Sequence, residues 1–470
     1  MGTGKRVSRW AAVAAAGSLL AGCAAPAARQ VRPVSDASGM RTVDAGAVPG
    51  MGTVTRSRAD GRRHYFAAYP EIPGARPLSA ALARAQDERI APFVAATEDA
   101  RPLPGGDVPE LNGRWSLVAA DGDVAGVRLV TTEFLGASGG EYRRTLWYDG
   151  AARRVLGSAA LLDGARGLAG LAGLVRARLG TRADPSRITA DPRAFGSIAF
   201  NDAGGMVVEF SDHTVAPGAP GRVAAVIERG AYDRLLSRFG RRARDAAGHR
   251  HPGLRLGAPP AAPHAVAATG TPPPAARTDC TKARCVALTF DDGPGPYTAR
   301  LLDDLAARRA RATFFVVGDN ARVYQDLLRR QVAEGHEIGN HAQSHRDLSR
   351  LTAVQVNSEV QRTQDVVRTA TGRAPVLLRP PYMASSEAVA GVARSLGVRQ
   401  TGWNLDALDA HDRDPAAIAD RVVRRARPDS IVLMHDVNEA SARAVPRIVD
   451  RLAAAGYTLV TVSELPPGRG

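Results

Sequence analysis

The feature that most restricts how this chain folds is a regular alternation of short apolar runs and amphipathic segments from Val286 onward. The runs have the length of buried strands, and most are separated by segments with helical spacing. Such alternation favours a parallel sheet with right-handed crossovers. We predict an α/β fold at the C-terminus, a closed or nearly closed (β/α) barrel of about seven parallel strands, with a doubly wound open sheet as the alternative. The expected strands are 286–290, 313–317, 337–339, 376–378, 400–405, 431–434 and 458–462; the expected helices are 298–309, 321–333, 353–370, 387–396, 415–425 and 442–454.

A different pattern precedes this region. Residues 51–245 predict a smaller α+β accessory domain, in which residues 77–94 have helical spacing and residues 231–239 form a closing helix. The Pro/Ala-rich residues 246–278 predict a linker to a C-terminal domain of residues 279–470. Within the accessory domain, the expected strands are 115–118, 127–131, 142–148, 198–200, 206–210 and 223–227.

The N-terminus has the pattern of an export signal. Basic residues precede a short apolar run, and Leu20-Ala21-Gly22-Cys23 is similar to a bacterial lipobox. We predict a lipoprotein signal peptide at 1–22, lipidation at Cys23 and a flexible tether at 23–50, with an ordinary signal peptide as the alternative. The protein is then exported and anchored by lipid to the outer face of the cell membrane.

Two further sequence features bear on the surroundings of the protein. Cys280 and Cys285 are a close pair in a chain expected to be exported, which favours a disulfide over half of a metal site or two free thiols. The formal charge of +15 is dispersed along the chain, with no basic tract interleaved with aromatic residues. We therefore expect no nucleic-acid partner, whereas an anionic envelope would attract such a chain.

Polar side chains occur at the C-terminal ends of the predicted parallel strands. In a parallel barrel these ends lie on one face, where barrel active sites are built. The C-terminal domain is therefore expected to carry a catalytic site there. The residues concerned are Asp291, Asp292, His341, His345, Arg379, Tyr382, Asp406, Asp409 and His435.

Three of these residues have the character of a metal site. His341 and His345 are four residues apart, so on a helical turn they would share a face and grip one ion. Asp292 would add an oxygen ligand. Two imidazoles and one carboxylate suit a catalytic divalent metal, most often zinc; the alternative is a pair of surface histidines at a helix start.

Five motifs in order give the C-terminal domain a family resemblance. It is similar to the polysaccharide deacetylases, the NodB-like domain of carbohydrate esterase family 4, over roughly residues 280–465. The resemblance implies a distorted barrel and metal-dependent hydrolysis of N-acetyl groups on an amino-sugar polymer. The motifs are Thr289–Pro294, His341–His345, Arg379–Tyr382, Asp406–Asp409 and Leu433–His435.

The resemblance also implies a role for each matched residue. Asp292, His341 and His345 would hold the metal, zinc or alternatively cobalt or manganese. Asp291 would be the general base that takes a proton from the attacking water, and Arg379 would orient it.

On the other side of the site, the resemblance implies that His435 protonates the departing amine, supported by Asp409. The backbone N–H of Tyr382 would stabilise the oxyanion, and Leu433 would line the pocket of the acetyl methyl group.

The chain departs from the family pattern at three positions. Ala342 stands where the family usually has Ser or Thr, Met383 replaces a common Gly, and Ala410 replaces a Trp that walls the acetyl pocket. None is a proposed ligand, base or acid. We expect an active enzyme whose acetyl pocket is wider or is completed by another group.

Three more residues have structural interpretations. His336 begins a strand and is expected to be structural. Trp403 is expected to pack in the barrel rather than stack on a sugar. His411 is expected in a loop that Asp414 caps into the next helix.

The accessory domain resembles an uncharacterised α+β domain that precedes some bacterial wall deacetylases and occurs in lysozyme-sensing anti-sigma factors. The resemblance rests on Tyr69–Ile72 and on the later segment from Phe210 to Leu236. It implies a domain that binds a wall component or a wall-active protein, with a passive spacer as the alternative.

For the whole chain we expect N-deacetylation of a cell-wall polysaccharide, peptidoglycan in the first place. Chitin oligomers or acetylated xylan are the alternative substrates. A non-catalytic wall-binding sensor is the alternative from another class of protein.

Overall fold

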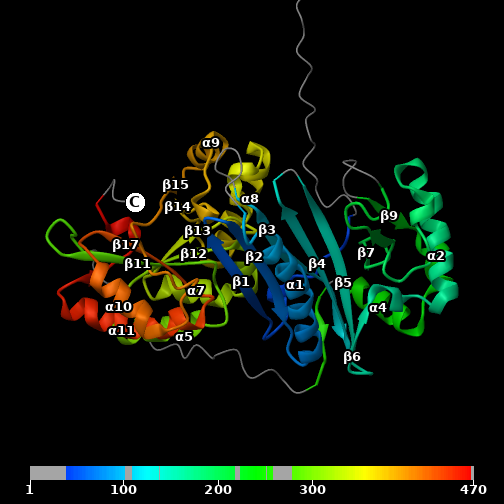
Figure 1. Ribbon diagram of the computed structural model, residues 1–470. Helices are drawn as coiled ribbons and strands as arrows, with labels where there is room; N and C mark the ends of the chain where they lie inside the picture. Colours follow the sequence, from blue (N-terminus) through cyan, green and yellow to red (C-terminus); the bar gives the residue numbers. More distant parts are fainter. Residues whose placement is uncertain are drawn as a thin grey trace, which may run out of the picture. The chain divides into compact units, whose positions relative to one another are not determined.

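The computed structural model describes residues 39–100, 108–136, 138–216, 223–249, 251–257 and 278–466, traced in Figure 1. Its C-terminal region contains one sheet in which every pairing is parallel, in the order β15-β14-β13-β12-β11-β17-β16, with β18 added beside β11. The predicted α/β architecture is confirmed as a half-barrel. The strands are β11 (Cys285–Asp291), β12 (Thr313–Val316), β13 (Glu337–Asn340), β14 (Leu377–Leu378), β15 (Arg399–Gln400), β16 (Leu405–Asp406), β17 (Ser430–His435) and β18 (Thr458–Leu459).

The helices between these strands begin and end at recognisable caps. In α10 the Asp414 side chain accepts a hydrogen bond from the Ala416 N–H, and in α8 the Thr352 and Gln355 side chains form a capping box before the helix ends at Gly372. The expected helix 321–333 is two helices that meet at Tyr324. The helices are α5 (Thr298–Ala307), α6 (Gly318–Val323), α7 (Gln325–Ala333), α8 (Ala353–Thr371), α9 (Glu387–Ser395), α10 (Pro415–Arg425) and α11 (Glu439–Ala454).

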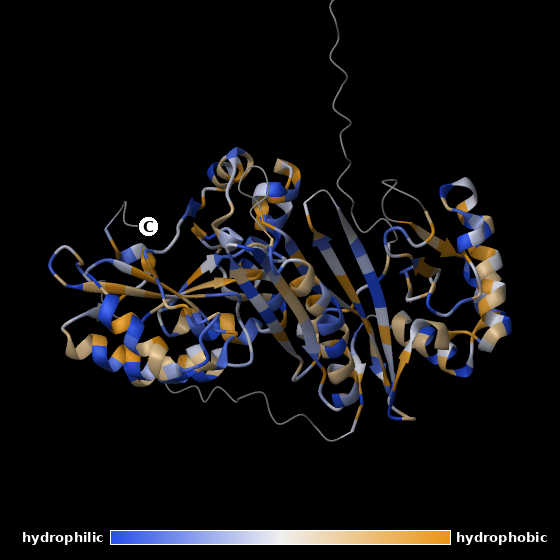
Figure 2. Cartoon of the chain, in the orientation of Figure 1, coloured by the Kyte–Doolittle hydropathy of each residue, from blue (hydrophilic) through white to orange (hydrophobic). Residues whose placement is uncertain are grey.

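The core of this domain lies between the sheet and its helices. The side chains of Leu288, Phe290 and Val432 from the strands pack with Leu301 of α5 and Ile448 of α11, all with no more than 1% of their surface exposed. Figure 2 shows the same division: β11 and β17 are apolar, whereas α10 and α11 carry both apolar and polar residues. Because these strands are buried, their C-terminal ends are held rigidly in place. The polar side chains that follow those ends are therefore held in place as well.

The accessory domain is α+β, with a mostly antiparallel sheet in the order β1-β2-β3-β4-β5-β6 and β10 beside β3. Helix α1 (Arg76–Ala96) confirms the helix expected at 77–94. The strands β1 and β2, which form a hairpin, were not predicted, because two exposed arginines and a half-buried serine interrupt the apolar pattern of β1. The strands are β1 (Gly52–Asp60), β2 (Arg63–Glu71), β3 (Glu110–Gly122), β4 (Val124–Phe134), β5 (Gly139–Asp149), β6 (Arg154–Gly157) and β10 (Gly253–Leu254).

A second, smaller antiparallel sheet completes the accessory domain. It consists of β7 (Ser197–Phe200), β8 (Met206–Glu209) and β9 (Ala224–Ile227), as expected. Helices α2 (Gly164–Leu179) and α4 (Arg238–Gly248) pack on the same core cluster.

The predicted closing helix at 231–239 is wrong. A short helix, α3 (Arg229–Tyr232), is followed by a single 3-10 turn, and α4 begins only at Arg238. The reason is Ser237, whose hydroxyl accepts a hydrogen bond from the Gly240 N–H at 2.9 Å and so caps a new helix.

The boundary of the tether also differs from the prediction. Residues up to 38, Cys23 among them, lie outside the described residues, as do residues 258–277 of the predicted linker. From Met40 onward the chain packs on the accessory domain: Met40 pairs with Asn201 and Val43 with Leu117, and Val48 is 5% exposed. These apolar residues are too widely spaced to show a period in the sequence.

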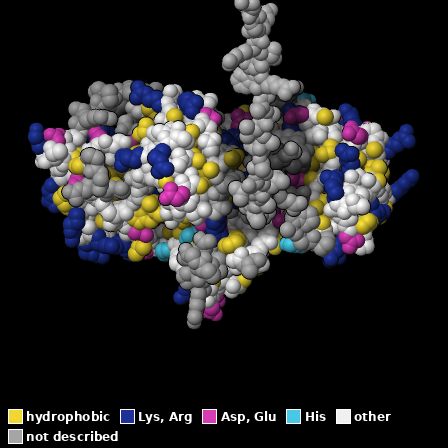
Figure 3. Space-filling view, turned by 90° about the horizontal axis from the view of Figure 1, so that it is seen from above, with side chains coloured by type: hydrophobic (Ala, Val, Ile, Leu, Met, Phe, Trp, Pro, Cys, Tyr) yellow, Lys and Arg dark blue, Asp and Glu magenta, His cyan; other side chains and the backbone are white. Residues whose placement is uncertain are grey.

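Cys280 and Cys285 form a disulfide in the structure, as the sequence predicted, just ahead of β11. On the face shown in Figure 3, the basic side chains are dispersed among hydrophobic and acidic ones. Among the described helices, none has the length and apolar character needed to cross a bilayer.

Candidate functional site

The polar groups at the strand ends surround one cavity of about 290 Å³. Asp291 ends β11 and Asp292 follows it, His341 follows β13, and His435 ends β17. Parallel strands bring these residues together from distant parts of the sequence. Asp291 and His435, for example, are 144 positions apart but are paired in register between β11 and β17. The predicted residues that line the cavity are Asp291, Asp292, His341, His345, Tyr382, Asp406, Leu433 and His435. Arg379 and Asp409 lie behind them, each 0% exposed.

Asp292, His341 and His345 form a buried cluster with ligand atoms within 4.8 Å of one another. Oδ1 of Asp292 lies 3.0 Å from Nε2 of His345 and 3.6 Å from Nε2 of His341. Nδ1 of His341 contacts the carbonyl oxygen of Arg379 at 2.6 Å. With Nδ1 assigned as the donor in that bond, Nε2 keeps its lone pair for a metal.

This cluster fits a divalent metal. Oδ1 of Asp292 is buried and accepts no hydrogen bond of acceptable geometry from the described residues. Burial lowers the pKa of His345, although the Asp292 carboxylate opposes the shift, so this imidazole is neutral at pH 7 and able to donate its lone pair. One carboxylate and two imidazoles are the donor set of a catalytic zinc site.

The expected helical turn at 341–345 is wrong. The segment is an irregular turn after β13, with left-handed backbone angles at Ala342 (φ 62°) and His345 (φ 54°). Its carbonyl oxygens at Ala342 and Gln343 accept hydrogen bonds from the N–H groups of Gly318 and Asp319, which hold the turn against α6. The imidazoles therefore converge because of these turns and not because of helical spacing. Ala342 itself is fully buried in an apolar cluster.

Asp291 is held by Arg379. Nη1 of Arg379 donates to Oδ1 of Asp291 at 2.8 Å and to the Thr289 hydroxyl at 2.7 Å, while Nη2 donates to the Gly402 carbonyl at 2.6 Å. The guanidinium lies 4.0 Å from the centre of the Phe315 ring. These contacts fix the carboxylate, whose Oδ2 lies 3.7 Å from Nε2 of His341.

His435 is paired with Asp409 on the opposite side of the cavity. Nδ1 of His435 lies 3.0 Å from Oδ1 of Asp409, and the His435 N–H donates to Oδ2 of the same carboxylate at 2.8 Å. The hydroxyl of Ser441 also donates to Asp409. Burial disfavours the imidazolium, but the Asp409 carboxylate, with Asp292 and Asp291 further away, outweighs it and raises the pKa of His435 to about 10. His435 is therefore a protonated acid at neutral pH.

This pairing has a measurable consequence in the metal-free protein. NMR titration should give His435 a pKa near 10, and Asp409→Asn should move that pKa down toward the ordinary value of 6.5. Because the pKa is raised on folding, the stability it contributes is complete below pH about 6.5 and is lost as the pH rises through about 10. A His435 pKa that does not change in Asp409→Asn would show that Asp409 is not the cause.

Tyr382 and Leu433 both line the cavity. Tyr382 has left-handed backbone angles (φ 59°, ψ 11°), which a bulky residue adopts only where its surroundings hold it. Leu433 is 6% exposed and lies at the cavity wall.

One wall of the cavity comes from a part of the chain that the sequence did not suggest. Ala410 lines the cavity without filling it, and the β1–β2 hairpin supplies the residues Ser57–Gly61 and His64 to the lining. The His64 ring stacks on Tyr382 with centroids 4.0 Å apart, and burial lowers the pKa of His64 to about 4. The hairpin therefore forms a wall of the cavity that Ala410 also lines.

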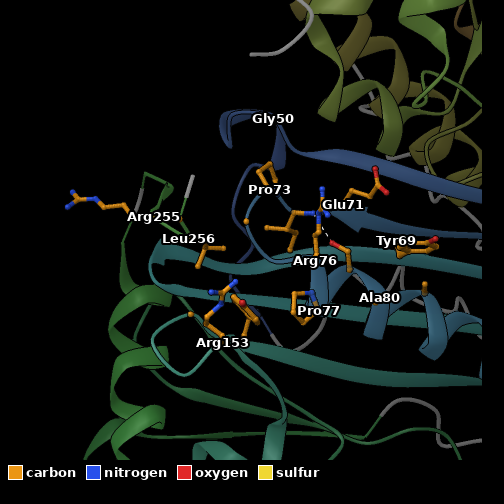
Figure 4. A pocket seen from close by; sticks show the side chains of 17 residues that line it. Gly50, Tyr69, Glu71, Pro73, Arg76, Pro77, Ala80, Arg153, Arg255 and Leu256 are labelled. Atoms are coloured by element: carbon orange, nitrogen blue, oxygen red, sulfur yellow. Dashed lines mark hydrogen bonds between the residues drawn. The ribbon is translucent and has the colours of Figure 1, made fainter. Parts of the chain in front are cut away.

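The cavity continues into a second groove of about 580 Å³. The two share Ser57, Ala410 and His435, and the second groove adds Tyr65 of the hairpin and Tyr297 of the C-terminal domain. No local pattern points to these hairpin residues, because they lie more than 200 positions before the residues they face. A larger groove of about 1210 Å³ lies within the accessory domain near Glu71, Arg76 and Leu256 (Figure 4). None of the catalytic candidates lines it.

A further residue of the site was missed although its position could have revealed it. Asp436 directly follows His435, is 1% exposed, and accepts a hydrogen bond from the Thr298 hydroxyl at 2.5 Å. Burial raises its pKa to about 7. A Cβ added to Gly293 would lie 2.0 Å from this carboxylate, which explains a glycine beside the Asp291-Asp292 pair.

His336, His411 and Trp403 are the residues that were expected to have structural roles. His336 is buried and its Nδ1 accepts a hydrogen bond from the Ala312 N–H at 3.1 Å, a structural role. Asp414 caps α10 as expected, and His411 is exposed in the loop before it. Trp403 packs against the core but also lines the cavity.

Comparison with known proteins gives a family for the C-terminal region. The family model for polysaccharide deacetylase matches residues 278–401. A chitin deacetylase of Colletotrichum lindemuthianum is 35% identical over 199 residues, which cover 39% of this chain and 80% of that protein.

Two bacterial relatives are longer proteins. The peptidoglycan-N-acetylmuramic acid deacetylase PdaC of Bacillus subtilis is 38% identical over 183 residues, which cover 39% of this chain and 38% of that protein. The peptidoglycan-N-acetylglucosamine deacetylase PgdA of Listeria monocytogenes is 34% identical over 181 residues, which cover 38% of each chain. This chain therefore spans about two fifths of the length of these two relatives.

Proposed function

The chain belongs to the polysaccharide deacetylase family of hydrolases, and from that premise we propose that it removes N-acetyl groups from amino sugars of a cell-surface polysaccharide in a metal-dependent reaction. The observation that carries the proposal is the complete set of reacting groups around one cavity. Asp292, His341 and His345 would hold the metal, with zinc as the metal we expect. When bound, such an ion supplies Lewis-acid activation of water and of the acetyl carbonyl.

The residues of the chain perform the proton transfers. Asp291, oriented by Arg379, takes a proton from the water that attacks the acetyl carbon. His435, kept protonated by Asp409, delivers a proton to the amine as the carbon–nitrogen bond breaks. The Tyr382 N–H would stabilise the oxyanion, and Leu433 would contact the acetyl methyl group.

We propose peptidoglycan as the substrate. A cavity that continues into a second groove suits a polymer, because sugars on both sides of the reacting unit need space. The two bacterial relatives are named for deacetylation of peptidoglycan sugars. A lipid anchor at Cys23, which we also propose, would keep an exported enzyme beside the wall of its own cell.

A comparison of polymers tests the substrate. Purified full-length protein with zinc is incubated with peptidoglycan, N-acetylchitooligosaccharide and acetylated xylan, and released acetate is measured. We expect the fastest release from peptidoglycan, with free amines located by mass spectrometry of the digested glycan. Faster release from chitin oligomers or xylan would contradict the substrate but keep the enzyme. Zinc binding without release from any polymer would favour a wall-binding sensor.

A further inference from the structure

The β1–β2 hairpin of the accessory domain contacts a proposed metal ligand directly. The Ser57 hydroxyl donates to Oδ2 of Asp292 at 2.6 Å. The amide of Asn320 donates to the Asp292 carbonyl at 2.7 Å and to the Thr55 hydroxyl at 3.2 Å, which joins the same strand to the same residue. Because Oδ2 is engaged by Ser57, the other oxygen, Oδ1, is left facing Nε2 of His345 and His341.

The same domain also holds His345. The Phe66 ring stacks on the His345 imidazole with centroids 4.3 Å apart and planes 14° apart. The amide of Asn112, 3% exposed, donates to the carbonyl oxygens of Ser344 at 2.9 Å and His345 at 3.0 Å. A histidine at φ 54° keeps that conformation only where its surroundings impose it. Here the ring and the carbonyl are both held from outside the C-terminal domain.

These contacts belong to a continuous interface between the accessory domain and the C-terminal domain. The Thr53 N–H donates to the Tyr324 hydroxyl at 2.8 Å, and the Asp347 N–H donates to Glu110 at 3.0 Å. Phe66 and Val317 pack in one apolar cluster, 3% and 0% exposed. The interface therefore combines apolar packing with hydrogen bonds between the two domains, and both restrict the side chains that they join.

We propose that the accessory domain is a working part of the metal site, and that Ser57 is the positioning residue that orients Asp292 toward the metal. The inference rests on the proposed function only for the metal site itself. It assigns the accessory domain a role that neither a wall-binding module nor a passive spacer requires. Partners of ligand side chains typically change metal affinity by about 10–100-fold when they are removed.

The test measures zinc affinity of the full chain by competition with a chromophoric chelator. Ser57→Ala should raise the zinc Kd by roughly 10–100-fold, whereas Ser57→Thr, which keeps the hydroxyl, should stay near the wild-type value. Ser186→Ala is the matched control: its hydroxyl donates to the Asp184 carboxylate at the same 2.6 Å, but on the surface of the accessory domain. That control should bind zinc like the wild type. In cobalt-loaded protein, the visible absorption spectrum should change in Ser57→Ala alone.

The outcomes separate this inference from the proposed function. Wild-type zinc affinity in Ser57→Ala, with an unchanged cobalt spectrum, would overturn the role of Ser57 while leaving the deacetylase intact. Equal loss of affinity in Ser57→Ala and Ser57→Thr would overturn it as well, because the hydroxyl would not be the cause. A wild-type chain that binds no zinc at all would contradict the metal site of the proposed function.

Discussion

Asp291→Asn is expected to lower kcat for acetate release by roughly 10²–10⁴-fold while leaving zinc affinity within a few-fold of wild type. Asparagine keeps the size and the hydrogen bond with Arg379 that Oδ1 makes, but it does not take up a proton from water. Asp291 is not in the cluster of metal donors, which consists of Asp292, His341 and His345. Steady-state kinetics and chelator competition on the same preparation measure both quantities.

A surface carboxylate provides the control for this variant. Asp450 also pairs with an arginine, Arg308, at 2.8 Å, but it is 60% exposed. Asp450→Asn should therefore leave kcat and zinc affinity unchanged. If Asp291→Asn instead lost zinc, the roles of Asp291 and Asp292 would be the reverse of those assigned.

Arg379→Met is expected to destabilise the fold by about 3–5 kcal/mol, because it leaves the buried Asp291 carboxylate without its positive partner. Arg379 is 0% exposed and also donates to the Thr289 hydroxyl and to the Gly402 carbonyl, so two further acceptors lose their donor. Urea unfolding monitored by circular dichroism measures the change. Arg379→Lys keeps the charge without the planar guanidinium, so its free energy of unfolding should lie between those of the wild type and Arg379→Met.

The matched control for Arg379 is again the surface pair. Arg308→Met removes an ion pair with the exposed Asp450, and such pairs contribute at most about 1 kcal/mol. If Arg379→Met and Arg308→Met lowered the free energy of unfolding equally, burial of the Asp291–Arg379 pair would not be what makes it stabilise the fold.

The sequence predicted the C-terminal domain well because its information is local. Each strand is an apolar run, and each polar group follows the end of a strand, so parallel pairing alone brings Asp291 and His435 together. The fold class and the gathering of these polar groups at one edge of the sheet could be inferred in this way, whereas the contacts of Arg379 with Asp291 and of Asp409 with His435 were implied by the family resemblance. The expected strand 400–405 is two strands, β15 and β16, separated by residues 401–404, and apolar content does not reveal such a break.

The sequence did not predict what depends on distant contacts. Ser57 and Asp292 are 235 positions apart, and nothing near Ser57 in the sequence marks it as the partner of a metal ligand. The conformation of residues 341–345 was missed for a related reason: its left-handed turns are stabilised by α6 and by Asn112, not by the residues within the turn.

The account is tested most directly by metal-dependent acetate release from peptidoglycan by the full chain. The protein is stripped with a chelator, assayed, reconstituted with zinc and assayed again. We predict no release after stripping, restored release with zinc, and no restoration in Asp292→Ala, which removes the carboxylate at the centre of the ligand cluster. Acetate release that continues unchanged after complete removal of metal, or no release from folded, zinc-loaded protein, would contradict it.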